Sequence, residues 1–341
     1  MAKRYRVSVI PGDGVGPEIA FPVLGVLETL SEALGGFRFE FLCLDAGDEV
    51  KRRTGVALPE ETLEGVKGSD VCLFIAVGET ASEVILPLRQ RLNLYANVRP
   101  AKTYPNVPHG RPGVDLVIVR ENTEGLYRRV EDGTEDWGVS MRVITRRASE
   151  RIARFAFELA RREGRGRVTC VHKANVLKST CGLFRDVCRE VALQYPEVGF
   201  DEMYVDACAL RLVMNPGAFD VIVTTNLFGD ILSDLTAGLV GGLGMAPSGN
   251  IGDDFAIFEP VHGSAPDIAG KGIANPSAAI LSAKMMLDWL GEKRGAEVLE
   301  RALIEVLKEG RTLTPDLGGR AKTHEMAEEV SQKIRKIAEV I

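Results

Sequence analysis

The alternation of short apolar strands with longer helical patterns constrains the fold of this chain more than any other feature. In the first third, strand patterns at 6–10, 37–44 and 71–77 alternate with helical patterns at 17–34 and 59–66. Strands that alternate with helices form βαβ units, in which the strands pair in parallel. We therefore predict an α/β fold with a largely parallel sheet and helices on its faces.

The sequence pattern changes near Pro100. The stretch 127–145 is polar and β-like without a clear core face, so we interpret it as an arm that pairs with another subunit, with a solvated hairpin as the alternative. A chain of 341 residues is longer than the chain that a single hydrophobic core usually supports, so we predict two lobes with a cleft between them. Further strands are predicted at 114–120, 167–172, 199–205 and 221–225, and helices at 148–163, 180–195 and in three segments after 277.

Composition excludes several classes of protein. The formal net charge is -6 and no basic tract is present, which argues against nucleic-acid binding. No apolar run is long enough to span a bilayer, so we expect no membrane association. The first residues lack the pattern of a signal peptide, and the six cysteines show no zinc-like pairing. We expect a cytoplasmic protein with reduced thiols.

Acidic residues gather where the chain has no basic ones. Asp230 and Asp234 lie four apart after the strand pattern 221–225, and residues 212–270 contain neither lysine nor arginine. On one helix face, two like charges at this spacing cost a few tenths of a kcal/mol. Oxygen ligands alone suit Mg2+ or Mn2+, and ligands collect at the carboxyl ends of strands. Asp206 follows another strand pattern in the same way. A solvated acidic face is the alternative for the pair alone.

Three arginines, Arg89, Arg99 and Arg120, fall within a short span of the chain. Guanidinium groups bind carboxylates through two parallel hydrogen bonds, so three of them suit a substrate with two carboxylates. Any one arginine alone would more commonly form a surface ion pair. Together, the arginine and aspartate trios predict a cleft that holds an anion and a divalent metal.

Two glycine-rich loops are candidates for nucleotide binding. Residues 12–16 follow a strand and open a helix, but they do not form the G-x-G-x-x-G pattern of a Rossmann fold. The loop 259–276 is the stronger candidate, because it combines backbone donors with a carboxylate at Asp267 and precedes a helix. A carboxylate beside the adenosine ribose would favour NAD over NADP. An ordinary connecting loop without a ligand is the alternative interpretation.

At this point the chain resembles a known family, the β-decarboxylating dehydrogenases that act on isopropylmalate, isocitrate and homoisocitrate. The resemblance covers nearly the whole chain, and the short loop at 78–81 is similar to the archaeal isopropylmalate branch. The motifs that carry it are Val9–Glu18, Leu94–Pro100, Val119–Tyr127, His172–Leu177, Asn226–Asp234, His262–Pro276 and Thr314–Gly319.

The resemblance implies a fold distinct from the Rossmann fold, with a mixed sheet flanked by helices and two domains. The first domain, on the nucleotide side, would be discontinuous, from 1–99 plus 253–341. The second, 100–252, would carry the dimer interface and the β arm at about 127–145. It also implies a homodimer with shared active sites, and it leaves further pairing to a tetramer open.

The resemblance also implies roles for individual residues. Tyr127 and Lys173 would be the catalytic pair. An ordinary tyrosine has a pKa near ~10, so Tyr127 would need cationic neighbours such as Arg120 or Lys173 to act near neutrality. Arg89, Arg99 and Arg120 would bind the substrate carboxylates, with Asn175 near substrate and nicotinamide. Asp230 and Asp234 would bind the metal, and the partner would lend Lys173 and Asp206, the latter to metal and substrate. Cofactor contacts would come from His262, Gly263, Ser264, Ala265, Asp267 and Asn275.

The segment before Arg89 indicates the substrate. Ile85 and Leu86 would form an apolar wall that suits an isopropyl group and offers no partner for a third carboxylate. The resemblance therefore implies NAD- and Mg2+- or Mn2+-dependent oxidative decarboxylation of 3-isopropylmalate, a step of leucine biosynthesis, with tolerance for smaller 3-alkylmalates. Homoisocitrate and isocitrate are the alternative substrates. A non-catalytic regulatory subunit would be expected to lack Tyr127, Lys173 or an aspartate, and a metal-dependent hydrolase would leave the 262–275 loop unexplained.

Overall fold

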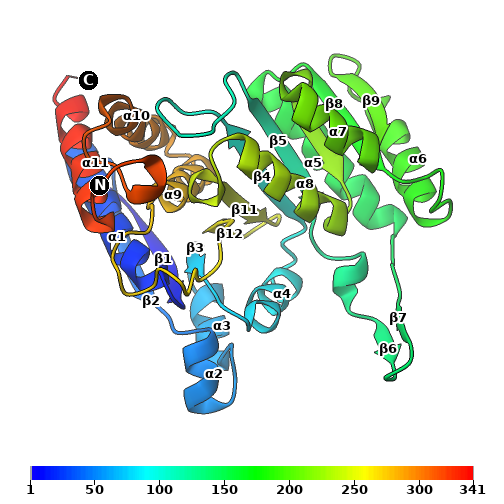
Figure 1. Ribbon diagram of the computed structural model, residues 1–341, viewed down its shortest axis with the longest axis horizontal. Helices are drawn as coiled ribbons and strands as arrows, with labels where there is room; N and C mark the ends of the chain where they lie inside the picture. The colour runs from blue at the N-terminus through cyan, green and yellow to red at the C-terminus, as the bar shows by residue number, and fades with distance from the viewer. Residues whose placement is uncertain (1, 341) are drawn as a thin grey trace.

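One mixed sheet of ten strands runs through the part of the chain, residues 2–340, that the computed structural model describes (Figure 1). Its centre is built from segments that are far apart in sequence, because β12 and β11 lie between β3 and β4. In spatial order the strands are β2 (Phe37–Cys43), β1 (Lys3–Gly12), β3 (Val71–Ala76), β12 (Ala256–Pro260), β11 (Pro247–Ile251), β4 (Ala96–Lys102), β5 (Asp115–Glu121), β10 (Val221–Thr224), β8 (Arg167–His172) and β9 (Gly199–Tyr204).

The sheet consists of two parallel blocks joined by an antiparallel centre. Strands β2, β1, β3 and β12 pair in parallel, as do β5, β10, β8 and β9. The pairings of β12 with β11, β11 with β4 and β4 with β5 are antiparallel. Three reversals in succession make the two blocks run in opposite directions.

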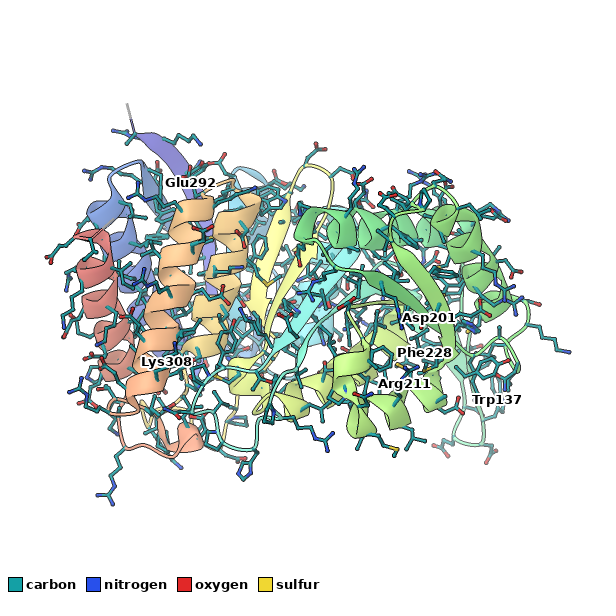
Figure 2. The ribbon with its side chains drawn as sticks, turned by 90° about the horizontal axis from the view of Figure 1, so that it is seen from above. Trp137, Asp201, Arg211, Phe228, Glu292 and Lys308 are labelled. Atoms are coloured by element: carbon teal, nitrogen blue, oxygen red, sulfur yellow. The ribbon has the colours of Figure 1, made fainter. Side chains whose placement is uncertain are left out.

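Helices cover both faces of each block. In Figure 2, α9 and α10 lie side by side over the first block, and α1 packs against α11, so that helices from the two ends of the chain meet. The helices are α1 (Gly16–Leu34), α2 (Asp48–Thr54), α3 (Glu60–Lys67), α4 (Ala81–Arg91), α5 (Arg146–Glu163), α6 (Thr180–Ala192), α7 (Val205–Met214), α8 (Asn226–Leu239), α9 (Ser277–Trp289), α10 (Lys293–Glu309) and α11 (Thr323–Ala338), with short 3-10 turns at η1 (Leu126–Arg128), η2 (Pro216–Ala218), η3 (Leu243–Met245) and η4 (Pro315–Leu317).

Strands buried on both faces explain this layering. All six residues of β3 are buried, and its side chains alternate between two clusters: Leu73 packs with α1 and α9–α11, whereas Phe74 packs with α3 and α4. In β10, Val223 packs with α5 and α6, and Ile222 packs with α7 and α8. A strand whose alternate residues both enter apolar clusters must lie between two helical layers.

The segment predicted to be an arm projects from the second block (Figure 1). It contains a two-stranded antiparallel ribbon, β6 (Glu131–Gly133) and β7 (Gly138–Ser140), in which every residue is exposed. Trp137 and Met141 are 53% and 57% exposed, which is unusual for such large apolar side chains. Pairing of this arm with another subunit stays a prediction.

The division into two domains also stays a prediction. The predicted boundary at 99/100 falls inside β4, and the second boundary, at 252/253, falls between β11 and β12. The sheet itself continues across both boundaries. Among residues 2–340, no helix has the length and apolar character needed to cross a membrane.

Candidate active site

The predicted catalytic and metal-binding residues follow the carboxyl ends of the strands in the second block. Arg120 is the penultimate residue of β5, and Lys173 follows β8. Asp206 lies in the first turn of α7, directly after β9, and α8, which carries Asp230, begins two residues after β10. Parallel neighbours end at one edge of a sheet, so the topology brings these residues to the same edge.

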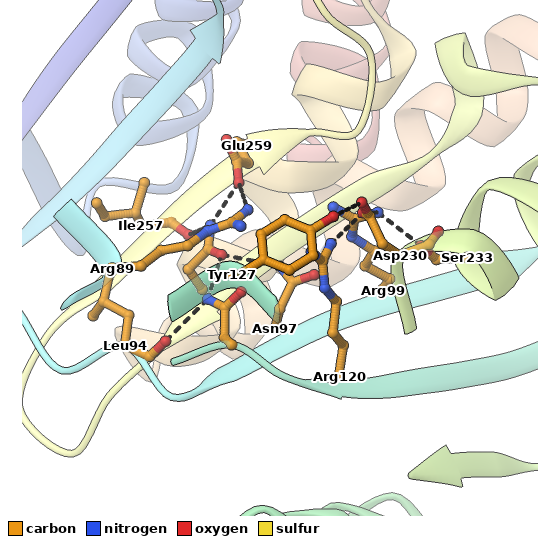
Figure 3. A network of polar contacts seen from close by, with 12 residues as sticks. Arg89, Leu94, Asn97, Arg99, Arg120, Tyr127, Asp230, Ser233, Ile257 and Glu259 are labelled. Carbon is orange, nitrogen blue, oxygen red and sulfur yellow. Dashed lines mark hydrogen bonds and ion pairs between the residues drawn. The ribbon is translucent and has the colours of Figure 1, made fainter. Parts of the chain in front are cut away.

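Asp230 is the centre of a polar cluster (Figure 3). Its Oδ1 is 3.2 Å from Nη1 of Arg99 and also accepts from Nη1 of Arg120. Its Oδ2 accepts from the hydroxyl of Tyr127 at 2.5 Å. Arg99 additionally donates to Oγ of Ser233 at 2.7 Å. The structure therefore brings together two predicted carboxylate-binding arginines, one predicted metal ligand and one predicted catalytic residue.

Arg120 is held rigidly beneath α8. Its side chain is 1% exposed, and its Nε and Nη2 donate to Oδ1 of Asn226 at 2.9 and 2.7 Å. A Cβ on Gly229 would lie 2.6 Å from Cβ and Cγ of Arg120. Glycine at this position is therefore what lets α8 approach the arginine closely enough to bring Asp230 to it.

Arg89 reaches the site from α4 and is paired with an acid that the sequence analysis did not single out. Its Nη2 lies 3.0 Å from Oε1 of Glu259, and the two side chains are 7% and 11% exposed. Asn250 also donates to this carboxylate at 2.7 Å, and its own Oδ1 accepts from Asn97 and Asn122 at 3.0 Å each. A chain of buried polar side chains thus crosses the three strands β4, β11 and β12 and ends on Arg89.

Replacing Glu259 with alanine should cost about 3–5 kcal/mol of unfolding free energy, because Arg89 would remain buried without its counter-charge. Denaturation in urea measures this. Glu292→Ala is the matched control: Glu292 pairs with Lys3, whose side chain is 65% exposed. A pair with one member in solvent should contribute at most about 1 kcal/mol. Equal losses in the two variants would contradict the structural role assigned to Glu259.

The three arginines lie close enough to repel one another. Burial and the neighbouring Arg99 lower the pKa of Arg120 to about 9, and burial lowers the pKa of Arg99, although the Asp230 carboxylate opposes that shift. Both side chains stay charged at neutral pH. Nε of Arg89 and Nε of Arg99 are buried without a hydrogen-bond partner among residues 2–340. Three guanidinium groups gathered in one place fit a bound dicarboxylate.

Tyr127 is protonated at neutral pH. Burial and the hydrogen bond to Asp230 raise its pKa, and these effects outweigh the guanidinium of Arg120, which lies 5.0 Å from the ring centre. The expected cationic neighbour is therefore present at Arg120, but the net shift is upward. In this arrangement the hydroxyl can donate a proton and is a poor base.

Lys173 and Asp206 form a separate pair. Nζ of Lys173 donates to Oδ1 of Asp206, and this contact lowers the pKa of the carboxyl. The side chain of Asp206 is 66% exposed. Asn175, two residues after Lys173, is also exposed. Within residues 2–340 of one chain, no three acidic, histidine or cysteine side chains gather in a metal-binding arrangement. Asp206 thus does not join Asp230 and Asp234 within one subunit, and its metal role stays a prediction about a partner subunit.

The donor chemistry of Asp230 and Asp234 fits part of a metal site. Both carboxylates point toward Nη1 of Arg99, at 3.2 and 3.5 Å, so they face the same space. Their side chains are 35% and 59% exposed, which leaves them accessible. Two oxygen ligands one helical turn apart suit a hard divalent cation that receives further ligands from substrate, water or another chain.

The loop after β12, predicted to bind the cofactor, is fastened to the start of α1. Glu18 accepts from the backbone N–H groups of Gly270 and Gly272, and Val15 N donates to the carbonyl of Ser264 at 2.9 Å. Nδ1 of His262 lies 3.0 Å from the Gly263 carbonyl. Burial lowers the pKa of His262, so its ring is neutral and, with Nδ1 as the donor, Nε2 is free to accept.

The other predicted cofactor residues of this loop differ in how available they are. Gly263 and Asp267 are exposed, and Ala265 adopts a positive φ of 43°. Asn275 is 6% exposed, and both ends of its amide are engaged: Nδ2 donates to Asp316 at 2.9 Å, and Oδ1 accepts from Ser277 N at 2.9 Å. Cofactor contacts from these residues stay predictions, and Asn275 already has a structural task at the start of α9.

The loop at residues 12–16 is filled by protein. A Cβ on Gly12 would lie 1.7 Å from the Ala76 carbonyl oxygen, and one on Gly16 would lie 2.0 Å from the Pro11 carbonyl oxygen. These glycines therefore permit close approach of the protein backbone to itself. The structure agrees with the prediction that this loop is not a Rossmann dinucleotide fingerprint.

The two predicted wall residues of α4 are placed differently. Ile85 is 8% exposed and belongs to the apolar cluster of β3, α3 and α4. Leu86 is 9% exposed and belongs to none of the four apolar clusters found in residues 2–340. Both residues lie about one helical turn before Arg89, but Ile85 is taken up by its apolar cluster, so Leu86 is the better placed of the two for contact with a substrate side chain.

The comparisons with known proteins place this fold and its cluster of arginines, aspartates and a tyrosine among the dehydrogenases. The chain belongs to the isocitrate/isopropylmalate dehydrogenase family, whose profile matches residues 6–330. It is 57% identical to a 3-isopropylmalate dehydrogenase of Archaeoglobus fulgidus, over 96% of this chain and 98% of the relative. It is 54% identical to an isocitrate/homoisocitrate dehydrogenase of Thermus thermophilus, over 98% and 99%. An isocitrate dehydrogenase structure from Methylococcus capsulatus superposes with a TM-score of 0.92 at 46% identity, covering 97% and 99%.

These comparisons confirm the predicted family and fold. They leave the substrate open, because relatives of similar identity carry isopropylmalate and isocitrate or homoisocitrate names.

Proposed function

We propose that this protein catalyses the NAD- and divalent-metal-dependent oxidative decarboxylation of 3-isopropylmalate to 2-oxo-4-methylpentanoate in the cytoplasm. The observation that supports it best is the combination of an arginine trio for two carboxylates with the apolar side chain of Leu86 one turn away. Isocitrate and homoisocitrate carry a third carboxylate, which this part of α4 offers no cation to receive. They remain the alternative substrates.

The residues of this chain divide the work of the reaction. Arg89, Arg99 and Arg120 hold the substrate carboxylates and fix C2 and C3 in place. Lys173 of the partner subunit, acting through water, takes the proton of the 2-hydroxyl. Bound NAD would serve as the acceptor for the hydride that leaves C2. When the C3 carboxylate leaves as CO2, its bonding electrons form an enolate, and Tyr127 delivers a proton to C3.

A divalent cation bound by Asp230 and Asp234, with Asp206 of the partner subunit, would acidify the 2-hydroxyl and stabilise the enolate charge. Arg99 and Arg120 both contact the Asp230 carboxylate and fix its position. Asp267 is exposed in the loop after β12, and its carboxylate would repel the 2'-phosphate of NADP.

A substrate panel tests the proposal. NADH formation, followed by absorbance with Mg2+ present, should give the highest kcat/KM for 3-isopropylmalate, with 3-methylmalate about tenfold or more lower because its smaller group leaves apolar surface uncovered. Isocitrate and homoisocitrate should be lower still, and EDTA should abolish turnover. Higher kcat/KM for isocitrate or homoisocitrate would select the alternative. Absence of turnover with every acid would contradict the dehydrogenase mechanism.

A homodimer that shares its two active sites is part of the proposal. Helices α7 and α8 carry exposed apolar side chains, among them Leu210 at 63%, Met214 at 73% and Ile231 at 57%. Exposed apolar groups gathered on packed helices are typical of a protein–protein interface. Asp206 lies on α7 beside this surface, so a second subunit packed there could receive it.

A further inference from the structure

A second cluster of arginines surrounds a hollow outside the site described above. The hollow has a volume of about 340 Å3 and lies between the end of α4, the loop 123–128 and the first turn of α5. Arg128, Arg147 and Arg151 all line it. This volume lies at the lower end of the range for small-molecule sites, which begins near ~300 Å3.

The arginines are unequally engaged. Arg151 is engaged by the protein: it donates to Asn93 at 2.7 Å and to Thr123 at 2.6 Å, its Nη2 lies 3.9 Å from Glu121, and its Nε is buried. Arg128 and Arg147 are exposed, and neither forms an ion pair or a side-chain hydrogen bond within residues 2–340. Two guanidinium groups without a protein partner, those of Arg128 and Arg147, therefore border the hollow beside the engaged Arg151.

The position of Arg147 is electrostatically unfavourable in the protein alone. It lies in the first turn of α5, where the helix dipole is positive, and that turn contains no acidic residue. Acids normally occupy such positions, and a cation there costs stability unless an anion is near. Arg147, which lines the hollow, therefore departs from the usual preference for acidic residues in the first turn of a helix.

One acid also lines the hollow, and it compensates the arginines only in part. Glu124 is 5% exposed and accepts from the backbone N–H and hydroxyl of Thr145 at 2.8 and 2.9 Å. Burial raises the pKa of Glu124 to about 7 despite these hydrogen bonds. Near neutrality, a sizeable fraction of this carboxyl is therefore uncharged, and the hollow keeps an excess of positive charge.

We propose that this hollow binds a phosphate group, either as inorganic phosphate or on a small metabolite. The two unpaired guanidinium groups of Arg128 and Arg147, next to the positive end of the α5 dipole, suit a tetrahedral dianion. The hollow also borders the active site. The Glu124 carbonyl accepts from Asn226 Nδ2 at 3.2 Å, and Oδ1 of the same asparagine holds Arg120. The proposal does not depend on the identity of the substrate.

Isothermal titration with inorganic phosphate tests the proposal, with sodium chloride at matched ionic strength as the blank. Arg147→Ala and Arg128→Ala should each weaken the phosphate Kd about three- to tenfold, as expected for loss of a charge-assisted contact. Arg162→Ala, in the last turn of the same helix, should leave Kd unchanged. Phosphate bound by Arg89, Arg99 and Arg120 would be the same in all of these variants, so the difference reports the hollow alone.

Two further measurements sharpen the outcome. Glycerol phosphate binding more tightly than inorganic phosphate would identify a metabolite ester as the ligand, whereas equal affinity would identify free phosphate. A crystal soaked in tungstate should show an anomalous peak between Arg128, Arg147 and Arg151. Identical phosphate affinities in wild type, Arg128→Ala, Arg147→Ala and Arg162→Ala, or tungstate only at Arg89, Arg99 and Arg120, would overturn the proposal.

Discussion

Asp230→Asn is expected to lower kcat/KM about a thousandfold. Asparagine has nearly the same size, but it loses the charge that faces Arg99, Arg120 and the Tyr127 hydroxyl. The substitution removes one proposed metal ligand, leaves the buried Arg120 without its counter-charge, and leaves Arg99 with Asp234 alone. Losses of this size are typical when a group that stabilises transition-state charge is removed. Steady-state kinetics over a range of Mg2+ concentrations measures the effect and should show a higher metal requirement.

Ser233→Ala is the matched control. Ser233 also accepts from Arg99, at 2.7 Å, and lies on the same helix, but it carries no charge and has no proposed metal contact. Its loss should reduce kcat/KM less than about tenfold, the effect of one hydrogen bond. If Asp230→Asn retained activity within tenfold of wild type at the same Mg2+ dependence, neither the metal site nor the charge cluster would have the proposed role.

Strong periodic patterns made much of the fold predictable. Apolar strands such as β3 and β10 and the long amphipathic helices are encoded locally, and the structure places them within a few residues of the prediction. The antiparallel hairpin β11–β12 was not predicted. Its first strand, Pro247–Ile251, contains proline, glycine and asparagine, which local propensity disfavours in strands.

Tertiary contacts explain why Pro247–Ile251 is nevertheless a central strand. A Cβ on Gly249 would lie 2.8 Å from the ring of Phe258, so only glycine leaves room for that ring. The amide of Asn250 is satisfied by Asn97, Asn122 and Glu259. These partners lie up to about 150 residues away along the chain, and no local window of sequence contains them.

The residues of the candidate site also differ in whether the sequence predicted them. Arg99, Arg120, Asp230 and Tyr127 were predicted from motifs, and the structure brings them into contact, although their roles stay predictions. Glu259 was missed because an acid at the end of an apolar strand does not reveal its partner. The sequence did contain a signal, because Glu259 is a charged residue within the otherwise apolar segment Ala256–Pro260. The proposed roles of Lys173 and Asp206 involve a second subunit, and a pattern within one chain carries no signal for contacts between chains.

A complementation experiment is expected to settle the sharing of active sites. Tyr127→Phe and Lys173→Met homodimers should each lose about a hundred- to ten-thousandfold in kcat, because each lacks one proton-transfer group. A heterodimer of the two variants should regain about half of wild-type activity. One of its sites would combine the intact Tyr127 of one chain with the intact Lys173 of the other. Differently tagged chains, co-expressed and purified through both tags, provide this heterodimer.

The mirror heterodimer provides the control and reverses the expectation. It pairs a wild-type chain with a chain that carries both Tyr127→Phe and Lys173→Met. With shared sites, each site of this dimer lacks one group, so activity should stay near that of the inactive homodimers. With sites contained in single chains, this dimer would show about half of wild-type activity and the first heterodimer almost none. Within one chain the Lys173–Asp206 pair is separate from the Asp230 cluster. This separation favours shared sites, and therefore an inactive mirror heterodimer.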